Sequence, residues 1–116
     1  MKRLRNLPYP KRMKPIGHNY TVYIITNDIK SVLYIGVTNQ IERRIYEHLQ
    51  NKGNKSTFAG RYSCYNLVYY ELHSNIVHAI EREKEIKKWR REKKDQLITD
   101  FNRNWDFLNN KFLTLD

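Results

Sequence analysis

The chain has 116 residues, which is enough for one domain with a modest core, and we expect no accessory domain. Its 22 lysine and arginine residues against 12 acidic ones give a formal net charge of +10, and nine tyrosines are interleaved with them. Excess cations attract phosphates and exposed rings stack on bases, so this balance favours nucleic acid as the partner over an ordinary small basic protein. No apolar run reaches the length of a membrane span, and Cys64 is the only cysteine, so we expect a cytoplasmic protein with no membrane partner and no internal disulfide.

Residues 1–19 are predicted to be a basic N-terminal arm, followed by a folded domain over residues 20–116. The arm carries lysines, arginines and all three prolines but no acidic residue, so no regular element is expected there. Such an arm can follow phosphates through counterion release, and a solvated tail is an equally good interpretation.

The segments Tyr20–Thr26 and Val32–Thr38 are rich in β-branched and aromatic residues, and the residues between them are turn formers. This pattern predicts an antiparallel hairpin. A four-residue loop, 27–30, would set Tyr23 directly opposite Tyr34, so that two phenols share one face of the sheet. Gly36 leaves a gap in the second strand, where another backbone or a ligand can come close.

A helix is predicted after the hairpin, because Asn39 and Glu42 have the spacing of a capping box. Arg44 and His48 stand one turn apart on it, beside an apolar stripe. The stripe consists of Ile41, Ile45 and Leu49.

Asn51–Gly60 contains two glycines and small polar residues and is predicted to be a loop. Lys52, Lys55 and Arg61 make this region positive, so it either grips a substrate or serves as a mobile connector. A third strand is predicted at Asn66–Leu72.

The segment Ser74–Arg90 is predicted to be a helix with a buried stripe, capped by Ser74 or Asn75. At about 100° per residue, Glu83 falls inside that stripe, where a carboxylate needs a positive partner: a metal ion, a fixed arginine or a structural ion pair. A bend or break is predicted beyond Arg90, which leaves open whether one helix or two follows. The expected stripe is Ile76, Ala79, Ile80 and Ile86.

Taken together, these residues resemble the GIY-YIG nuclease superfamily, and in particular its small standalone bacterial branch. The resemblance rests on VYI at Val22–Ile24, YIG at Tyr34–Gly36, Arg44 beyond the glycine, and AIEREKEIK at Ala79–Lys87 followed by Trp89. It implies an α/β (α+β) fold in which helices flank a three-stranded antiparallel sheet. It also implies a metal-dependent endonuclease that hydrolyses DNA phosphodiester bonds.

The same resemblance implies the catalytic residues, which are Tyr23, Tyr34, Arg44, His48 and Glu83, with Glu83 as the metal ligand. Only one carboxylate is in place, so a single Mg²⁺ or Mn²⁺ ion is expected. Arg44 suits bidentate contact with the scissile phosphate. Tyr23 is the candidate for orienting or deprotonating the attacking water, with His48 as an alternative proton relay.

Two positions depart from the family pattern. Val22 replaces the glycine of the first motif, and Arg103 stands where the standalone branch often has proline, after Asn102. The expected partner is DNA, single-stranded, duplex or branched, with a targeting protein as a possible addition and no small-molecule cofactor. The alternative is a catalytically inactive nucleic-acid-binding module of the same fold. The predicted nucleic-acid contacts are Gly36, Lys52, Lys55, Arg61 and Asn102.

Overall fold

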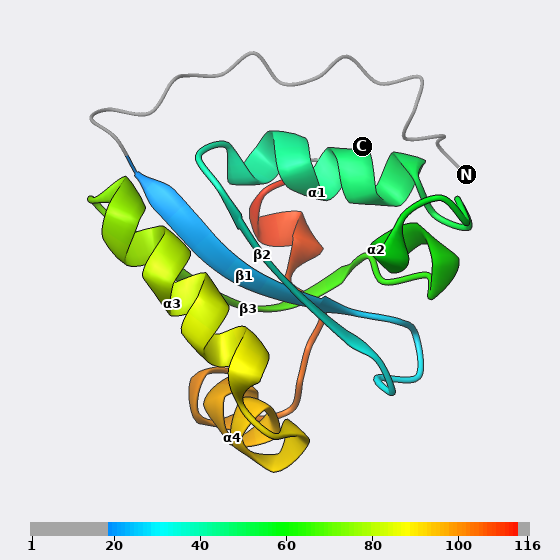
Figure 1. Ribbon diagram of the computed structural model, residues 1–116. Helices are drawn as coiled ribbons and strands as arrows, with labels where there is room; N and C mark the ends of the chain where they lie inside the picture. The colour runs from blue at the N-terminus through cyan, green and yellow to red at the C-terminus, as the bar shows by residue number, and fades with distance from the viewer. Residues whose placement is uncertain (1–18, 114–116) are drawn as a thin grey trace.

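The computed structural model describes residues 19–113, so the predicted basic arm lies outside the described residues except for Asn19. Three antiparallel strands form one sheet in the order β2-β1-β3, with helices on both faces (Figure 1). This confirms the expected three-stranded sheet flanked by helices. The elements are β1 Tyr20–Thr26, β2 Leu33–Thr38, α1 Ile41–Gln50, α2 Phe58–Arg61, β3 Asn66–His73, α3 Ile76–Lys88, α4 Arg91–Phe101 and a short 3-10 helix, η2 Asn109–Lys111.

The central strand β1 is buried on both faces because successive side chains of a strand point in opposite directions. Val22 and Ile24 pack against α3 and α4 in one core cluster. Tyr23 and Ile25 pack against α1 in a second cluster on the opposite face. Helices α1 and α3 therefore cover different faces of the sheet, and the edge strand β2 runs between them in Figure 1.

The hairpin register differs from the prediction by two residues. Thr26 pairs with Leu33, so Tyr34 lies opposite Ile25 and not opposite Tyr23. The loop is longer than expected because the Asn27 side chain accepts hydrogen bonds from the backbone of residues 31 and 32, at 2.8 and 3.2 Å. A shift of two residues keeps each side chain on its face, so the two tyrosines still share one side of the sheet.

The residue opposite Tyr23 is Gly36, and the predicted gap at this glycine is filled. A Cβ atom built on Gly36 would lie 2.9 Å from Cε2 of Tyr23, and still closer to the end of the ring. Gly36 is buried under the phenol ring of its own neighbouring strand. The expectation that Gly36 contacts nucleic acid directly is therefore not supported by this arrangement.

The predicted capping box of the first helix is wrong. α1 begins at Ile41 with Gln40 as its N-cap, and no side chain caps it. Asn39, the predicted cap, lies one residue before the observed N-cap. Instead, the Thr38 hydroxyl accepts a hydrogen bond from the Gln40 backbone at 3.1 Å.

Two helices follow β3, which settles the question left open by the sequence. Asn75 caps α3 by accepting hydrogen bonds from the backbone of Val77 and His78. Trp89 and Arg90 adopt extended backbone angles and separate α3 from α4. The predicted stripe of α3 is only half buried, because its two isoleucines nearest the N-terminus, residues 76 and 80, are exposed. No helix within residues 19–113 is long and apolar enough to cross a membrane.

Candidate functional site

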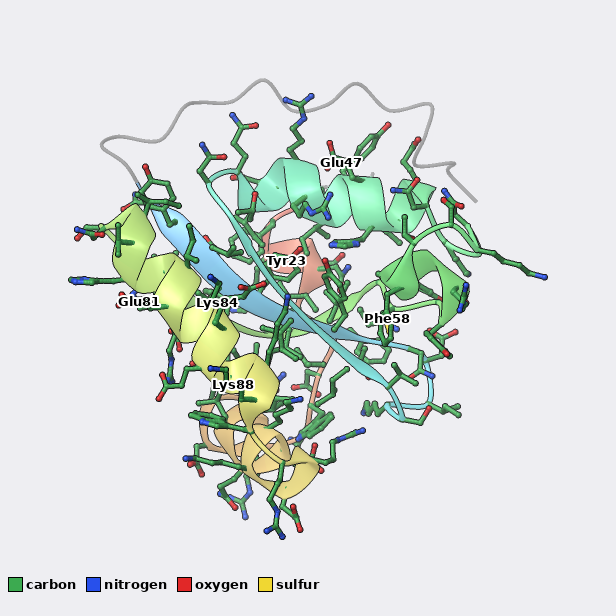
Figure 2. The ribbon with its side chains drawn as sticks, in the orientation of Figure 1. Tyr23, Glu47, Phe58, Glu81, Lys84 and Lys88 are labelled. Atoms are coloured by element: carbon green, nitrogen blue, oxygen red, sulfur yellow. The ribbon has the colours of Figure 1, made fainter. Side chains whose placement is uncertain are left out.

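Five side chains meet between the sheet and α1, and we call them the Tyr23 cluster. Tyr23 and Tyr34 come from β1 and β2, and Figure 2 shows Tyr23 beneath α1. The other three lie at helical spacings of three and four residues on α1, so they share one face. The members are Tyr23, Tyr34, Arg44, Glu47 and His48.

Two hydrogen bonds fix the centre of this cluster. The Tyr23 hydroxyl lies 2.8 Å from Nε2 of His48, and Nε of Arg44 donates to the same hydroxyl oxygen at 3.3 Å. A guanidinium has no acceptor atom, so the phenol oxygen must accept from Arg44. A neutral imidazole that carries its proton on Nδ1 leaves Nε2 free to accept the phenol proton.

Burial sets the protonation of this pair. It lowers the pKa of His48 to about 4, and the positive charge of Arg44 acts in the same direction. Burial also raises the pKa of Tyr23 far above its usual value, and the hydrogen bond from Arg44 offsets only part of that rise. At neutral pH the phenol is therefore protonated and the imidazole is neutral, so one of the two groups donates a hydrogen bond to the other.

Arg44 connects the buried pair to solvent. Its side chain is 37% exposed, and Nη1 lies 3.0 Å from Oε1 of Glu47. The Tyr34 hydroxyl also interacts with Arg44, and the Tyr34 ring lies 6.5 Å from Tyr23 and 5.5 Å from His48 between centres. The sequence analysis missed Glu47, although its position three residues after Arg44 is the spacing of a helical ion pair.

Glu83 lies on the other helix and pairs with Lys87, whose Nζ is 2.6 Å from Oε2. On the same helix, Arg82 Nε reaches Glu71 of β3 at 2.9 Å. Helical geometry, about 100° per residue, puts Glu83 and Arg82 on opposite flanks of the buried stripe. Because Arg82 faces β3, Glu83 faces the other way, toward the β2 edge of the sheet.

The structure does not join Glu83 to the Tyr23 cluster by a hydrogen bond within the described residues. The Glu83 side chain is 13% exposed, so its carboxylate is partly desolvated but open at one side. One such carboxylate fits a magnesium-type ion, which takes few protein ligands and completes its shell with water and phosphate oxygens. No group of three or more His, Cys, Asp or Glu side chains that could hold a metal occurs within residues 19–113.

The three cations predicted to contact substrate have different surroundings. The Lys52 ammonium lies 4.6 Å from the centre of the Tyr65 ring, and Tyr65 donates a hydrogen bond to Asp28 at 2.9 Å. The Lys52 ammonium therefore already contacts an aromatic ring of the chain itself. Lys55 and Arg61 are exposed and make no ion pair with any described residue.

Asn102 has a structural role. It is 9% exposed, and its amide donates to the backbone oxygens of Val68 and Asp106 at 3.0 and 2.9 Å. Its carbonyl oxygen accepts a hydrogen bond from the Asp106 backbone at 3.0 Å. These bonds tie the end of α4 to β3, so the expected contact between Asn102 and nucleic acid is not supported.

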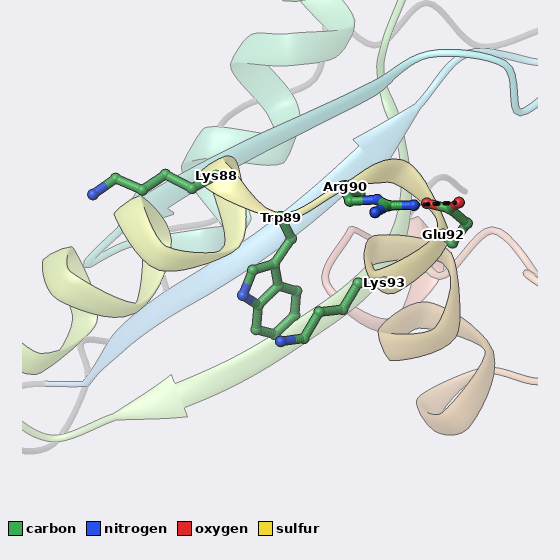
Figure 3. A pocket seen from close by; sticks show the side chains of 5 residues that line it. All are labelled: Lys88, Trp89, Arg90, Glu92 and Lys93. Carbon is green, nitrogen blue, oxygen red and sulfur yellow. Dashed lines mark hydrogen bonds and ion pairs between the residues drawn. The ribbon is translucent and has the colours of Figure 1, made fainter.

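A second basic feature is the open pocket where α3 meets α4, lined by Lys88, Trp89, Arg90, Glu92 and Lys93 (Figure 3). The Lys93 ammonium lies 4.3 Å from the centre of the Trp89 ring, and Arg90 pairs with Glu92 at 3.4 Å. The guanidinium of Arg82 lies 5.2 Å from the same indole. Two cations of the chain itself therefore lie over the indole, and the pocket is mainly basic.

The family model described as the GIY-YIG catalytic domain matches residues 19–96, a range that contains the Tyr23 cluster and Glu83 but not Asn102. A UPF0213 protein of Haloquadratum walsbyi is 43% identical over 84 residues, which cover 70% of this chain and 91% of that protein. A UPF0213 protein of Clostridium perfringens is 44% identical over 81 residues, covering 70% of this chain and 83% of that protein.

The solution NMR structure of a UPF0213 protein from Bacillus halodurans is 32% identical to this chain. It covers 84% of this chain and 99% of its own, with a TM-score of 0.49. The matched family model and the identities to the two relatives identify the chain: it belongs to the GIY-YIG nuclease family, and it is similar to the UPF0213 proteins within it.

Proposed function

We propose that this protein is a metal-dependent endonuclease that hydrolyses phosphodiester bonds of DNA, with the Tyr23 cluster and Glu83 as its active site. The observation that carries the proposal is the hydrogen-bonded series from Arg44 through Tyr23 to His48. A half-exposed guanidinium, a buried phenol and a neutral imidazole are the groups that a phosphate and an attacking water require. The stability of a hydrophobic core alone does not require three such polar groups bonded in series.

The first task of the site is to remove a proton from water. In the proposed step, a water molecule gives its proton to the Tyr23 oxygen while Tyr23 gives its own proton to His48 Nε2. The resulting hydroxide forms a bond to phosphorus, the bond from phosphorus to the leaving sugar oxygen breaks, and that oxygen takes a proton from solvent. A neutral phenol must lose its own proton as it takes one from water, so the proposed step needs a second acceptor, and His48 Nε2 is within hydrogen-bond distance for that role. His48 returns this proton to solvent at the end of the reaction.

The second task is to hold the phosphate. Arg44 suits this role because a guanidinium donates two parallel hydrogen bonds to phosphate oxygens. Tyr23 is only 1% exposed, so water reaches its oxygen once Arg44 turns from the phenol and Glu47 toward the phosphate. Tyr34, which is half-buried beside Arg44, is placed to donate a hydrogen bond to the same phosphate or to the water.

The third task is to compensate the charge that develops on the phosphate. Glu83 is the residue that would hold one Mg²⁺ or Mn²⁺ ion, and such an ion would neutralise phosphate charge and make bound water more acidic. Lys87, whose side chain is 49% exposed, would then give up its ion pair with Glu83 and remain as a cation near the substrate strand. The net charge of +10 supports a polyanionic substrate.

A cleavage assay tests this proposal. The protein is incubated with end-labelled single-stranded, duplex and branched DNA, and with RNA, in magnesium, in manganese or in chelator. Cleavage of at least one DNA substrate, in metal only, is the expected result. If DNA is bound but no substrate is cut in either metal, the chain is a nucleic-acid-binding module and the proposed activity is wrong.

A further inference from the structure

Two aromatic side chains beside the Tyr23 cluster are held out to solvent. Phe58 is 52% exposed and Tyr62 is 44% exposed, and their ring centres lie 4.8 Å apart. Both belong to the turn of α2, one helical turn apart, and Arg61 lies next to them on the same element. Large apolar side chains that are grouped and exposed mark a surface that something else covers.

Hydrogen bonds and close packing hold the backbone of the turn that carries these rings. Thr57 caps α2 by accepting a hydrogen bond from the Gly60 backbone at 2.9 Å, and the Gly53 backbone donates to the Gly60 oxygen at 3.0 Å. Gly60 is buried, and a Cβ there would lie 2.6 Å from the backbone oxygen of Asn51. This turn is therefore closely packed, so the backbone that carries the two exposed rings has little room to move.

The rings also continue inward to the proposed active site. The Phe58 ring lies 6.2 Å from that of Tyr34 and is tilted by only 29° from it, and Tyr34 lies 5.5 Å from His48. Figure 2 places Phe58 on the same side of the molecule as Tyr23. A row of rings thus runs from the buried phenol to solvent and ends at the element that carries Arg61. Lys55 lies three residues before Phe58 in the chain, and both cations are exposed and make no ion pair with a described residue.

We propose that Phe58 and Tyr62 form a stacking site for one unpaired nucleobase of the substrate strand, next to the phosphate that Arg44 holds. Every base has a flat π face, and stacking on an aromatic side chain strengthens binding severalfold or more per base. Arg61 and Lys55 supply cations for the adjoining phosphates. This inference rests on the proposed function and narrows its substrate to strands with an unpaired or extruded base, because a base inside a duplex cannot reach a protein ring.

Binding in chelator, without any cleavage, tests the site. Single-stranded oligonucleotides carry the fluorescent base 2-aminopurine at successive positions, and its quenching by stacking is measured with the parent protein, Phe58→Leu and Tyr62→Leu. Leucine keeps apolar bulk but removes the π face. Phe101→Leu is the matched control, since Phe101 is 47% exposed and also touches a tyrosine ring.

The parent and Phe101→Leu are expected to quench the probe at one preferred position. Phe58→Leu and Tyr62→Leu lose that quenching and bind the single strand about tenfold more weakly, with duplex binding little changed. Quenching that is equal in all four proteins, or absent at every position, would overturn the stacking site.

The two experiments distinguish failure of the stacking site from failure of the proposed nuclease activity. Probe quenching that depends on Phe58 and Tyr62, without cleavage in metal, would support the stacking site and refute the nuclease. Metal-dependent cleavage that Phe58→Leu and Tyr62→Leu leave unchanged would support the nuclease and refute the stacking site.

Discussion

The Tyr23 hydroxyl lies 2.8 Å from Nε2 of His48, and Nε of Arg44 donates a hydrogen bond to the same hydroxyl oxygen at 3.3 Å. The imidazole is neutral at neutral pH, because its pKa is lowered to about 4, mainly by burial. In the proposed mechanism a proton passes through this pair, from the phosphate side toward α1. The predictions below follow from this relationship and from the residues around it.

Removing the Tyr23 hydroxyl should abolish cleavage while the fold is kept. Tyr23→Phe retains the ring over Gly36 but leaves water without its proton acceptor, so the single-turnover rate should fall by about 100-fold or more. The free energy of unfolding should fall by only about 1 kcal/mol, for the lost hydrogen bonds. Rates and urea unfolding curves measured on the same preparations separate the two effects.

Tyr69→Phe is the matched control, because Tyr69 is also a buried tyrosine whose hydroxyl is bonded to an acidic side chain, Glu71, on the other face of the sheet. This variant should lose stability but keep its cleavage rate. Equal rate losses in the two variants would mean that Tyr23 has no special role.

Protonation of His48 should make the fold less stable in mild acid. The pKa of His48 is about 4 when folded and 6.5 in the unfolded chain, so between these values the unfolded state binds more protons. Stability therefore rises with pH across this window and is lost as the pH falls from 6.5 to 4, by about 3 kcal/mol at most. His48→Gln should remove this part of the pH dependence in urea titrations at several pH values; identical slopes in parent and variant would contradict the assignment.

A methyl group on Gly36 should displace Tyr23. The added Cβ would lie 2.9 Å or less from ring atoms of Tyr23, a side chain that is 1% exposed and hydrogen-bonded to His48 and Arg44. Gly36→Ala should lower the free energy of unfolding by about 1–3 kcal/mol and should also slow cleavage. Gly53→Ala serves as the control, since Gly53 has a φ of 83° and open space around it: it should lose stability through backbone strain alone and cleave normally.

Arg44→Lys should lower the cleavage rate by about 100-fold, although the charge is retained, because an ammonium cannot make the two parallel bonds of a guanidinium. Stability should change little, since the Arg44 side chain is 37% exposed. Arg43→Lys is the neighbouring control, with a side chain that is 60% exposed. Comparable rates for the two variants would remove Arg44 from the site.

Much of the fold could be predicted from local sequence patterns. Runs of β-branched and aromatic residues mark β1, β2 and β3. A break was predicted beyond Arg90, whereas the chain breaks at Trp89 and Arg90 and the polar run that suggested it lies within α4. The register of the hairpin could not be predicted in this way. It depends on one side chain, Asn27, which bonds to the far end of the loop and lengthens it by two residues.

Only part of the candidate site could be predicted, because the sequence does not show which of its side chains are buried. Sequence spacing places Tyr23, Arg44 and His48 near one another, but it does not reveal which hydroxyl is covered or which side chains bond to it. Those properties come from the closure of α1 over the sheet. Gly36 was interpreted as a gap for a ligand because a strand sequence does not show that the opposite side chain already fills it. The signal for Phe58 and Tyr62 is equally weak, since exposure of a ring in a short turn depends on its packing.

The role of Glu83 decides whether this site is a metal-dependent nuclease. The measurement is the single-turnover cleavage rate against magnesium concentration for the parent, Glu83→Gln and Glu81→Gln, the last an exposed carboxylate on the same helix (Figure 2). We predict that Glu81→Gln follows the parent curve and that Glu83→Gln shows no magnesium-dependent cleavage, a loss of about 1,000-fold. A Glu83→Gln protein that cleaves DNA at the parent rate in magnesium would contradict the proposed active site.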